Sequence, residues 1–159
     1  KGEAEVGVPG PLSESWGRFD IWPLFDEPFV LLVKADHPLA SRNTIEIASL
    51  RGERILRRAY CELCSQIDEI LQAAHVISPV NHVVANEHDL AMLLAAGTGV
   101  AIAPRSLPAS QGVRKLPIED LPLKRAVNLF AVAGRQRSLV AATFIKAVRA
   151  ADWSRRLSA

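Results

Sequence analysis

Two cysteines separated by two residues form the most distinctive short motif. Cys61 and Cys64 enclose Glu62-Leu63, and this spacing puts both sulfurs on one face of a helix. A thiol at a helix N-terminus has a lowered pKa and is a better nucleophile, so oxidant sensing is one interpretation. Packing or pocket lining is the more common role, and zinc would need two further ligands. None of the four histidines has metal-ligand spacing to this pair, so we predict no metal site.

An arginine pair and a tyrosine precede these cysteines. Arg57 or Arg58 could bind a carboxylate through paired hydrogen bonds, with Tyr60 as an aromatic wall beside it. A helix that begins near Glu62 would aim free backbone N–H groups at the same anion. The alternative is that the arginines are solvated strand ends and that Tyr60 packs between lobes. The pattern favours a small carboxylate as ligand.

A second polar group, Asn86-Glu87-His88, stands just before a predicted helix. Asn86 is a good N-cap, and capping is the more common role for it. No serine or cysteine occupies a recognisable nucleophile turn, so we predict no enzymatic activity. Gly97-Thr98-Gly99 is not a dinucleotide fingerprint, because the third glycine and the following helix are missing. We therefore expect a binding module without a cofactor.

Composition is that of one globular domain. The chain has 159 residues, of which 49% are apolar and 23% charged, and a formal net charge of +2. Its charges are scattered, so no basic block suggests contact with DNA. No apolar run approaches the roughly 20 residues of a membrane helix, and the first residues form no signal region. These features predict a cytosolic location and no membrane partner.

Strand-like and helix-like stretches alternate, which is typical of an α/β fold with parallel strands. We expect strands at 4–8, 19–25, 28–33, 54–56, 79–85, 99–103, 112–118 and 126–133. We expect helical segments at 44–50, 62–74, 87–96 and 138–153. In the last of these helices, Ser138 is a plausible N-cap and Phe144, Ile145 and Val148 are expected on the inner side.

The order of these elements resembles the regulatory domain of LysR-type transcriptional regulators. Residues 3–8 are similar to that family's first regulatory strand, and 36–40 (Asp-His-Pro-Leu-Ala) to its turn after the crossover strand. The most specific match is 95–104, where Gly97 ends a helix and Gly99 lets a buried strand begin two residues later. This resemblance covers residues 3 to about 153. It implies a type 2 periplasmic-binding-protein-like α/β fold with two Rossmann-like lobes.

The resemblance also implies a domain organisation in which the first lobe is incomplete. Residues 1–26 would be a remnant of the first lobe with its crossover, and 27–118 the second lobe. Residues 119–159 would supply the return crossover, a strand and the C-terminal helix of the first lobe. The family's N-terminal winged helix-turn-helix is absent from this sequence.

Ligands of such folds lie beyond the carboxyl ends of strands, in the cleft between lobes. The resemblance therefore implies effector-binding residues in three segments: Pro9, Gly10, Pro11, Arg58, Ala59, Tyr60, Cys61, Asn86, Glu87 and His88. It implies a small-molecule co-inducer, homodimers, tetramers of the full-length regulator, and DNA binding only through the missing segment. Two alternatives stay open: a redox-sensing regulator that uses Cys61 and Cys64, and a solute-binding protein of the same fold.

Overall fold

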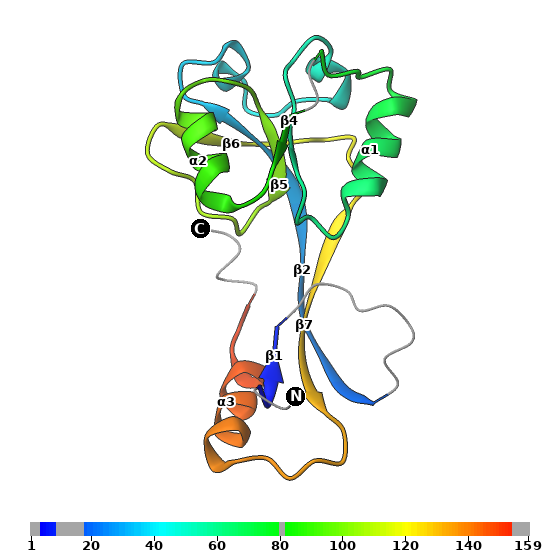
Figure 1. Cartoon of the computed structure of the whole chain (residues 1–159), viewed down its shortest axis with the longest axis vertical. Helices are drawn as coiled ribbons and strands as arrows, with labels where there is room; N and C mark the ends of the chain where they lie inside the picture. The colour runs from blue at the N-terminus through cyan, green and yellow to red at the C-terminus, as the bar shows by residue number, and fades with distance from the viewer. Residues whose placement is uncertain (1–3, 9–17, 80–81, 154–159) are drawn as a thin grey trace. The chain divides into compact units, whose positions relative to one another are not determined.

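The computed structural model describes residues 4–8, 18–79 and 82–153, which form two compact units (Figure 1). The first unit comprises the described residues of 1–27 and 125–159, and the second comprises those of 28–124. The chain passes between the units twice, along strand β2 (Phe19–Lys34) and at the start of strand β7 (Lys124–Val132).

The second unit is built on a mixed sheet. Strands β3 (Leu56–Arg58) and β4 (His82–Val84) pair in parallel. An isolated parallel bridge between Ile55 and Val100 joins the β3 segment to the start of β5 (Ala101–Pro104). Both β5 and β6 (Val113–Pro117) pair antiparallel with β2.

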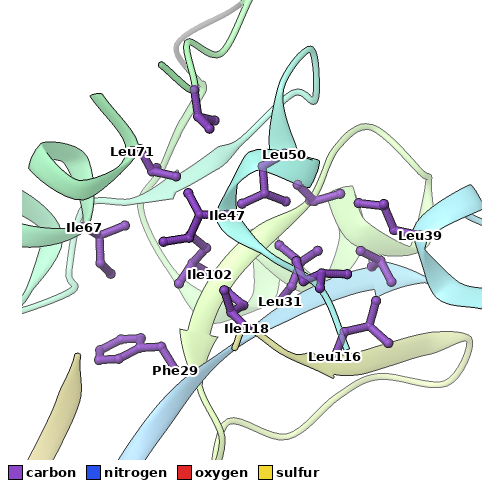
Figure 2. Close-up of a cluster of buried hydrophobic side chains, with 14 of the residues drawn as sticks. Phe29, Leu31, Leu39, Ile47, Leu50, Ile67, Leu71, Ile102, Leu116 and Ile118 are labelled. Atoms are coloured by element: carbon purple, nitrogen blue, oxygen red, sulfur yellow. The ribbon is translucent and has the colours of Figure 1, made fainter. Parts of the chain in front are cut away.

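Strand β2 is buried on both faces of this sheet. On one face Phe29, Leu31 and Val33 pack in a cluster with residues of helix α1 (Cys64–Ala73) and of the 3-10 turns η1 (Pro38–Ser41) and η2 (Ile47–Leu50), as Figure 2 shows in part. On the other face Val30 and Leu32 pack with Leu90 and Leu94 of helix α2 (Glu87–Ala95). The continuous apolar run at 28–33 is therefore a strand covered on both sides, as the sequence predicts.

The first unit contains β1, part of β2, β7 and helix α3. Strand β1 (Val6–Gly7) pairs antiparallel with β7, and β7 is the neighbour of β2. Helix α3 (Leu139–Ala150) begins after Ser138, whose Oγ accepts a hydrogen bond from the Ala141 N–H at 3.2 Å. The N-cap prediction for Ser138 is confirmed.

One face of α3 is more exposed than the sequence suggests. Ile145 is buried and Val148 half-buried, but Phe144 is 48% exposed, so its expected inward position is wrong. Leu139 and Val140 on the same helix are also exposed, at 84% and 79%. Helix α3 therefore presents three large apolar side chains that nothing in the described chain covers.

Two of the predicted strands are in fact one. The stretches 19–25 and 28–33 belong to a single strand, β2, which runs through Pro23 and Pro28. Proline lacks an N–H to donate, yet its carbonyl still pairs, and that of Pro28 accepts a hydrogen bond from the Arg105 N–H at 3.0 Å. A proline therefore marks no strand end here.

The turn at 96–100 explains why two glycines lie so close together. Gly97 has φ +69°, and the Thr98 N–H donates to the Leu93 carbonyl at 3.0 Å, which closes the C-terminus of α2. A Cβ on Gly99 would lie 2.3 Å from the Arg54 carbonyl oxygen, closer than atoms can approach. The two predictions, that Gly97 ends a helix and that a buried strand begins two residues after Gly99, are both confirmed.

A charged pair lies where each strand leaves the first unit. Glu27 on β2 is fully buried, and its Oε1 accepts a hydrogen bond from Arg125 Nε on β7 at 2.8 Å. A buried carboxylate is costly to hold unless it is paired, so this contact ties the two connecting strands together. The Arg125 side chain is 25% exposed and can be hydrated, whereas Glu27 is fully buried. The Glu27 charge therefore depends more on this contact than the Arg125 charge does.

We predict that Arg125→Met lowers the free energy of unfolding by about 3–5 kcal/mol, because the Glu27 carboxylate stays buried without this cation. Chemical denaturation followed by circular dichroism measures the change. Lys124→Met, at the exposed neighbouring position, removes the same charge and should cost less than about 0.5 kcal/mol. Equal stability of the two variants would show that the pair does not hold the strands.

Candidate effector-binding site

The carboxyl ends of β3 and β4 lie together at one edge of the second unit's sheet. Arg58, the last residue of β3, is in register with Val84, the last residue of β4, and the Ala59 N–H donates to the Val84 carbonyl at 3.0 Å. Helix α2 begins three residues later, at Glu87. The parallel pairing therefore brings two of the predicted segments, 58–61 and 86–88, next to each other.

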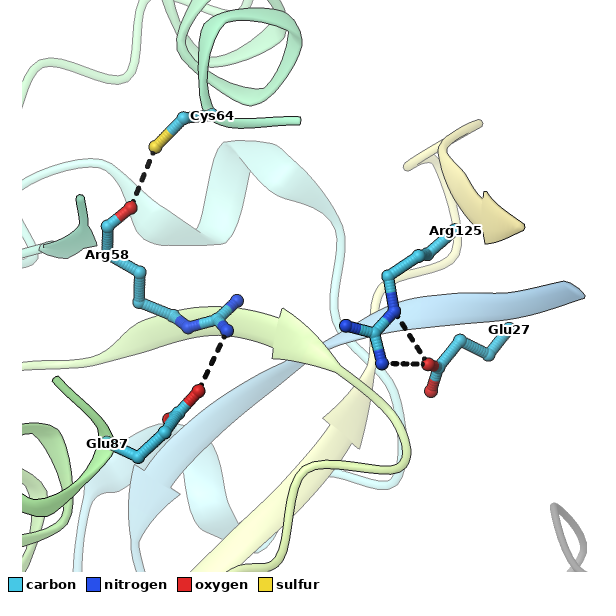
Figure 3. Close-up of polar contacts among 5 residues, drawn as sticks. All are labelled: Glu27, Arg58, Cys64, Glu87 and Arg125. Atoms are coloured by element: carbon cyan, nitrogen blue, oxygen red, sulfur yellow. Dashed lines mark hydrogen bonds and ion pairs between the residues drawn. The ribbon is translucent and has the colours of Figure 1, made fainter. Parts of the chain in front are cut away.

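Among the described residues at these strand ends, Arg58 is the one charged side chain that is buried. Its exposed fraction is 5%. Its Nη2 donates to Glu87 Oε1 at 3.1 Å, as Figure 3 shows. The Nε and Nη1 atoms are buried and have no hydrogen-bond partner. Unpaired buried donors are costly, so an arginine in this state is suited to receive an anion.

Tyr60 lies against this guanidinium. The Arg58 Cζ atom is 4.8 Å from the centre of the Tyr60 ring, a cation–π contact. The Tyr60 hydroxyl is buried and forms no hydrogen bond, and burial raises the pKa of Tyr60, so the phenol stays protonated as a donor. Burial works to lower the pKa of Arg58, but the Glu87 carboxylate, which accepts a hydrogen bond from it, helps to leave that pKa raised.

The start of α2 carries the other part of this site. Asn86 Oδ1 accepts a hydrogen bond from the Asp89 N–H at 2.9 Å, which confirms the capping role predicted for Asn86. Glu87 occupies the first helical position, where a negative charge is stabilised, and its side chain is 47% exposed. His88 is exposed beside it.

The two cysteines lie in different environments. Helix α1 begins at Cys64 rather than at Glu62, so Cys61 stands in the preceding turn, and the prediction of two sulfurs on one helical turn is wrong. Cys61 is buried in the core cluster that contains Phe29, and both thiols are free. The sequence favoured packing for this pair, and Cys61 has that role.

Cys64 does not have the environment of an activated thiol. Its Sγ donates a hydrogen bond to the Arg58 carbonyl at 3.0 Å. Burial is the main influence and raises the pKa of Cys64, although the nearby Arg57 acts in the opposite direction. The expectation of a lowered pKa fails because desolvation outweighs the nearby Arg57 cation.

Arg57, the other arginine of the pair, is already engaged. Its Nε donates to Asp68 Oδ2 of α1 at 2.8 Å, and this contact raises the pKa of Arg57. Of the two arginines that the sequence offered for a carboxylate, Arg58 is the one with buried, unpaired donors.

A groove on the α1 side of β3 was not foreseen from the sequence. It has a volume of about 580 Å³ and is lined by Ile55, Arg57, Asp68, Leu71, Gln72, Val76, Ile77 and Ser78. Arg58 is not among these residues. The only hint in the sequence is the apolar pair Val76-Ile77 after the helix, and Ile77 is 77% exposed.

The structure thus brings together Arg58, Tyr60 and Glu87. Ala59 contributes a backbone contact, Asn86 caps α2, and Cys61 belongs to the core. Pro9, Gly10 and Pro11 lie outside the described residues. The Arg58–Glu87 pair itself was not predicted, although opposite charges that follow adjacent parallel strands were a usable signal.

Two features of the described residues bear on other classes of function. In 4–8, 18–79 and 82–153, no group of three or more histidine, cysteine or acidic side chains could hold a metal ion. Within the same ranges, every helix is too short or too polar to cross a bilayer.

Known proteins with similar sequences are bacterial regulators. The LysR substrate binding domain family matches residues 1–153. The HTH-type transcriptional regulator YybE of Bacillus subtilis is 30% identical over 125 residues, which cover 76% of this chain and 42% of YybE. A hydrogen peroxide-inducible genes activator of Dickeya chrysanthemi is 29% identical over 135 residues, or 80% of this chain and 43% of the activator. The chain spans less than half the length of these relatives.

Solved structures with a similar fold are regulatory domains. The regulatory domain of CcmR from Synechocystis PCC6803 gives a TM-score of 0.76 at 23% identity and covers 93% of this chain and 73% of that one. The effector binding domain of QuiR gives 0.72 at 17% identity, with 91% and 69% covered. Reduced OxyR gives 0.69 at 25% identity, with 94% and 71% covered.

These comparisons agree with the architecture of the described units. The predicted α/β, periplasmic-binding-protein-like fold is confirmed, since the sheets and helices superimpose on effector-binding domains of that fold. The family match extends from the first residue to Trp153, the range in which the sequence motifs resemble the LysR pattern. The chain belongs to the LysR substrate-binding domain family.

Proposed function

We propose that this chain binds a small organic anion, and that it does so as the effector-sensing domain of a transcriptional regulator. Arg58 is the anchor for a carboxylate of that effector, with Tyr60 beside it. Membership of the LysR family favours a regulator over a solute-binding protein of the same fold.

The observation that carries this proposal is the state of Arg58. Its side chain is 5% exposed and two of its nitrogens, Nε and Nη1, have no acceptor, and the Tyr60 hydroxyl beside it also lacks a partner. A carboxylate has two oxygens that match paired guanidinium donors, and such bonds are about twice as strong as neutral ones. A carboxylate bound through either fork of the guanidinium would provide an acceptor for one of these two nitrogens.

The ligands of similar domains fit this chemistry. The structure of the CcmR domain contains 2-PG, that of QuiR contains shikimate, and one of the BenM domain contains benzoate. At pH 7 benzoate and shikimate are carboxylates. These compounds are suitable first probes for this chain, whose own effector we identify only by class.

In the whole regulator we expect this domain to act in the cytoplasm within a homodimer, with a separate N-terminal segment that binds DNA. Support for self-association comes from helix α3, where Leu139, Val140 and Phe144 are exposed. Effector binding would change the geometry of the oligomer to the extent that the effector prefers one arrangement over another.

Thermal-shift screening with matched carboxylates and carboxamides tests the proposal. We expect acids such as benzoate or shikimate to raise the melting temperature, since a ligand at 100 times its Kd adds about 2.7 kcal/mol. Their amides should give no shift. Arg58→Gln should weaken acid binding about 10- to 100-fold, the loss of a charge-assisted contact worth about 1.5–3 kcal/mol.

Arg57→Gln is the matched control, because it removes the same charge one residue away from a side chain already held by Asp68. Arg58→Lys keeps the buried charge but lacks the planar fork, and it guards against a folding defect in Arg58→Gln. Acid binding that survives in both Arg58 variants, or a shift with amides alone, would contradict the proposal.

A second candidate function is oxidant sensing through the cysteines, favoured by relatives named as hydrogen peroxide-inducible activators. A Cys61 or Cys64 thiolate would attack peroxide, forming a sulfenic acid and releasing water after proton transfer. The other thiol would then displace a second water to form a disulfide. The raised pKa of Cys64 makes that thiol the poorer attacking group at neutral pH.

We predict that alkylation of Cys64, measured in Cys61→Ser by mass spectrometry across pH, has a midpoint above that of an ordinary thiol. The direction follows from burial, which disfavours the thiolate, so the rate rises only at alkaline pH. An unfolded control should titrate near pH 8.5.

Oxidant response of the double variant separates the two candidates. If peroxide changes the properties of the unmodified chain but not of Cys61→Ser/Cys64→Ser, redox sensing stands.

An alkylation midpoint for Cys64 well below 8.5 would show that our account of its environment is wrong.

A further inference from the structure

Glu87 stands where an effector carboxylate would bind. A guanidinium offers two forks to a carboxylate, Nε with Nη2 and Nη1 with Nη2, so Nη2 belongs to both. In this structure Nη2 is the donor that Glu87 Oε1 accepts, at 3.1 Å. A ligand that binds through either fork must therefore share or replace the contact of Glu87.

We propose that Glu87 is an internal competitor for the effector, and that binding replaces the Glu87 carboxylate on Arg58 with that of the ligand. This inference rests on the proposed function and adds a regulatory element to its site. The ligand takes Nη2 together with Nε or Nη1, both unpaired without it. Arg58 thus has a carboxylate partner before and after binding.

The two side chains differ in the way that such an exchange requires. Arg58 is 5% exposed and cannot leave, whereas Glu87 is 47% exposed and can turn into water. Water reaches the Glu87 carboxylate and screens its contact with Arg58, so that contact is weaker than two bonds from a ligand. The helix N-terminus that stabilises Glu87 would stabilise the incoming anion as well.

Replacement of Glu87 by the ligand also removes a polar contact between β3 and α2. Arg58 ends β3 and Glu87 begins α2, so their contact fastens the helix to the strand end (Figure 3). When a ligand takes Nη2, this polar link is lost while the apolar packing of Leu90 and Leu94 stays. Ligand binding therefore acts first on the N-terminal turn of α2.

Acetate is a probe small enough to reach an open guanidinium fork. Its binding can be followed through the ¹H–¹⁵N signal of Arg58 Nε, assigned by its absence in Arg58→Lys. We expect Glu87→Gln and Glu87→Asp each to lower the half-saturating acetate concentration about 3- to 10-fold. Glu69→Gln, on the exposed face of α1, removes the same charge and should behave as the unmodified chain.

Glu87→Asp separates competition from simple repulsion between negative charges. Its carboxylate keeps the charge but is one methylene too short to hold Nη2, so competition predicts tighter acetate binding in this variant too. Acetate binding unchanged in Glu87→Asp, or weaker in both Glu87 variants, would overturn the inference. So would a signal that does not respond to acetate even in Glu87→Gln.

These results are separable from the test of the proposed function. If acids bind in a manner that depends on Arg58 while the Glu87 variants bind acetate no more tightly, only the competitor role fails. If the Arg58 variants bind acids as well as the unmodified chain, the anchor itself is wrong.

Discussion

Burial of strand β2 on both faces is the constraint from which the second unit follows. Five consecutive residues, 29–33, are apolar and nearly inaccessible, so the sheet needs a layer of chain on each side. Helix α1 with the two 3-10 turns supplies one layer, and α2 supplies the other. Helix α1 follows β3 and helix α2 follows β4, so the carboxyl ends of these two strands lead into both layers. The location of Arg58 and Glu87 is thus a consequence of packing that involves neither residue.

Two ion pairs in the chain differ in which partner is buried. In the Glu27–Arg125 pair the carboxylate is fully buried and the arginine is partly exposed, and both residues have further contacts. In the Arg58–Glu87 pair the arginine is the buried member, and two of its nitrogens have no acceptor. The first pair closes a structural joint between strands. The second pair leaves donors of the buried arginine without an acceptor, as in a site that binds an anion.

Much of the fold could be predicted from the sequence because its signals are local. The apolar run at 28–33, the caps Ser138 and Asn86, and the glycine that ends α2 each depend on a few neighbouring residues. Prediction failed where distant contacts decide the outcome. Burial rather than helix position sets the pKa of Cys64, and Phe144 is exposed although its spacing suits an inner face. The pairing of Arg58 with Glu87 depends on strand register, which spacing alone does not give.

The central claim is that a carboxylate binds at Arg58, and a crystal structure of the chain with 4-bromobenzoate tests it most directly. The bromine's anomalous signal locates the compound independently of any assumed site. Our account predicts that its carboxylate oxygens lie about 2.7–2.9 Å from the Arg58 guanidinium, with Glu87 turned away. A compound bound in the groove beside Ile55, with Arg58 still held by Glu87 alone, would contradict it.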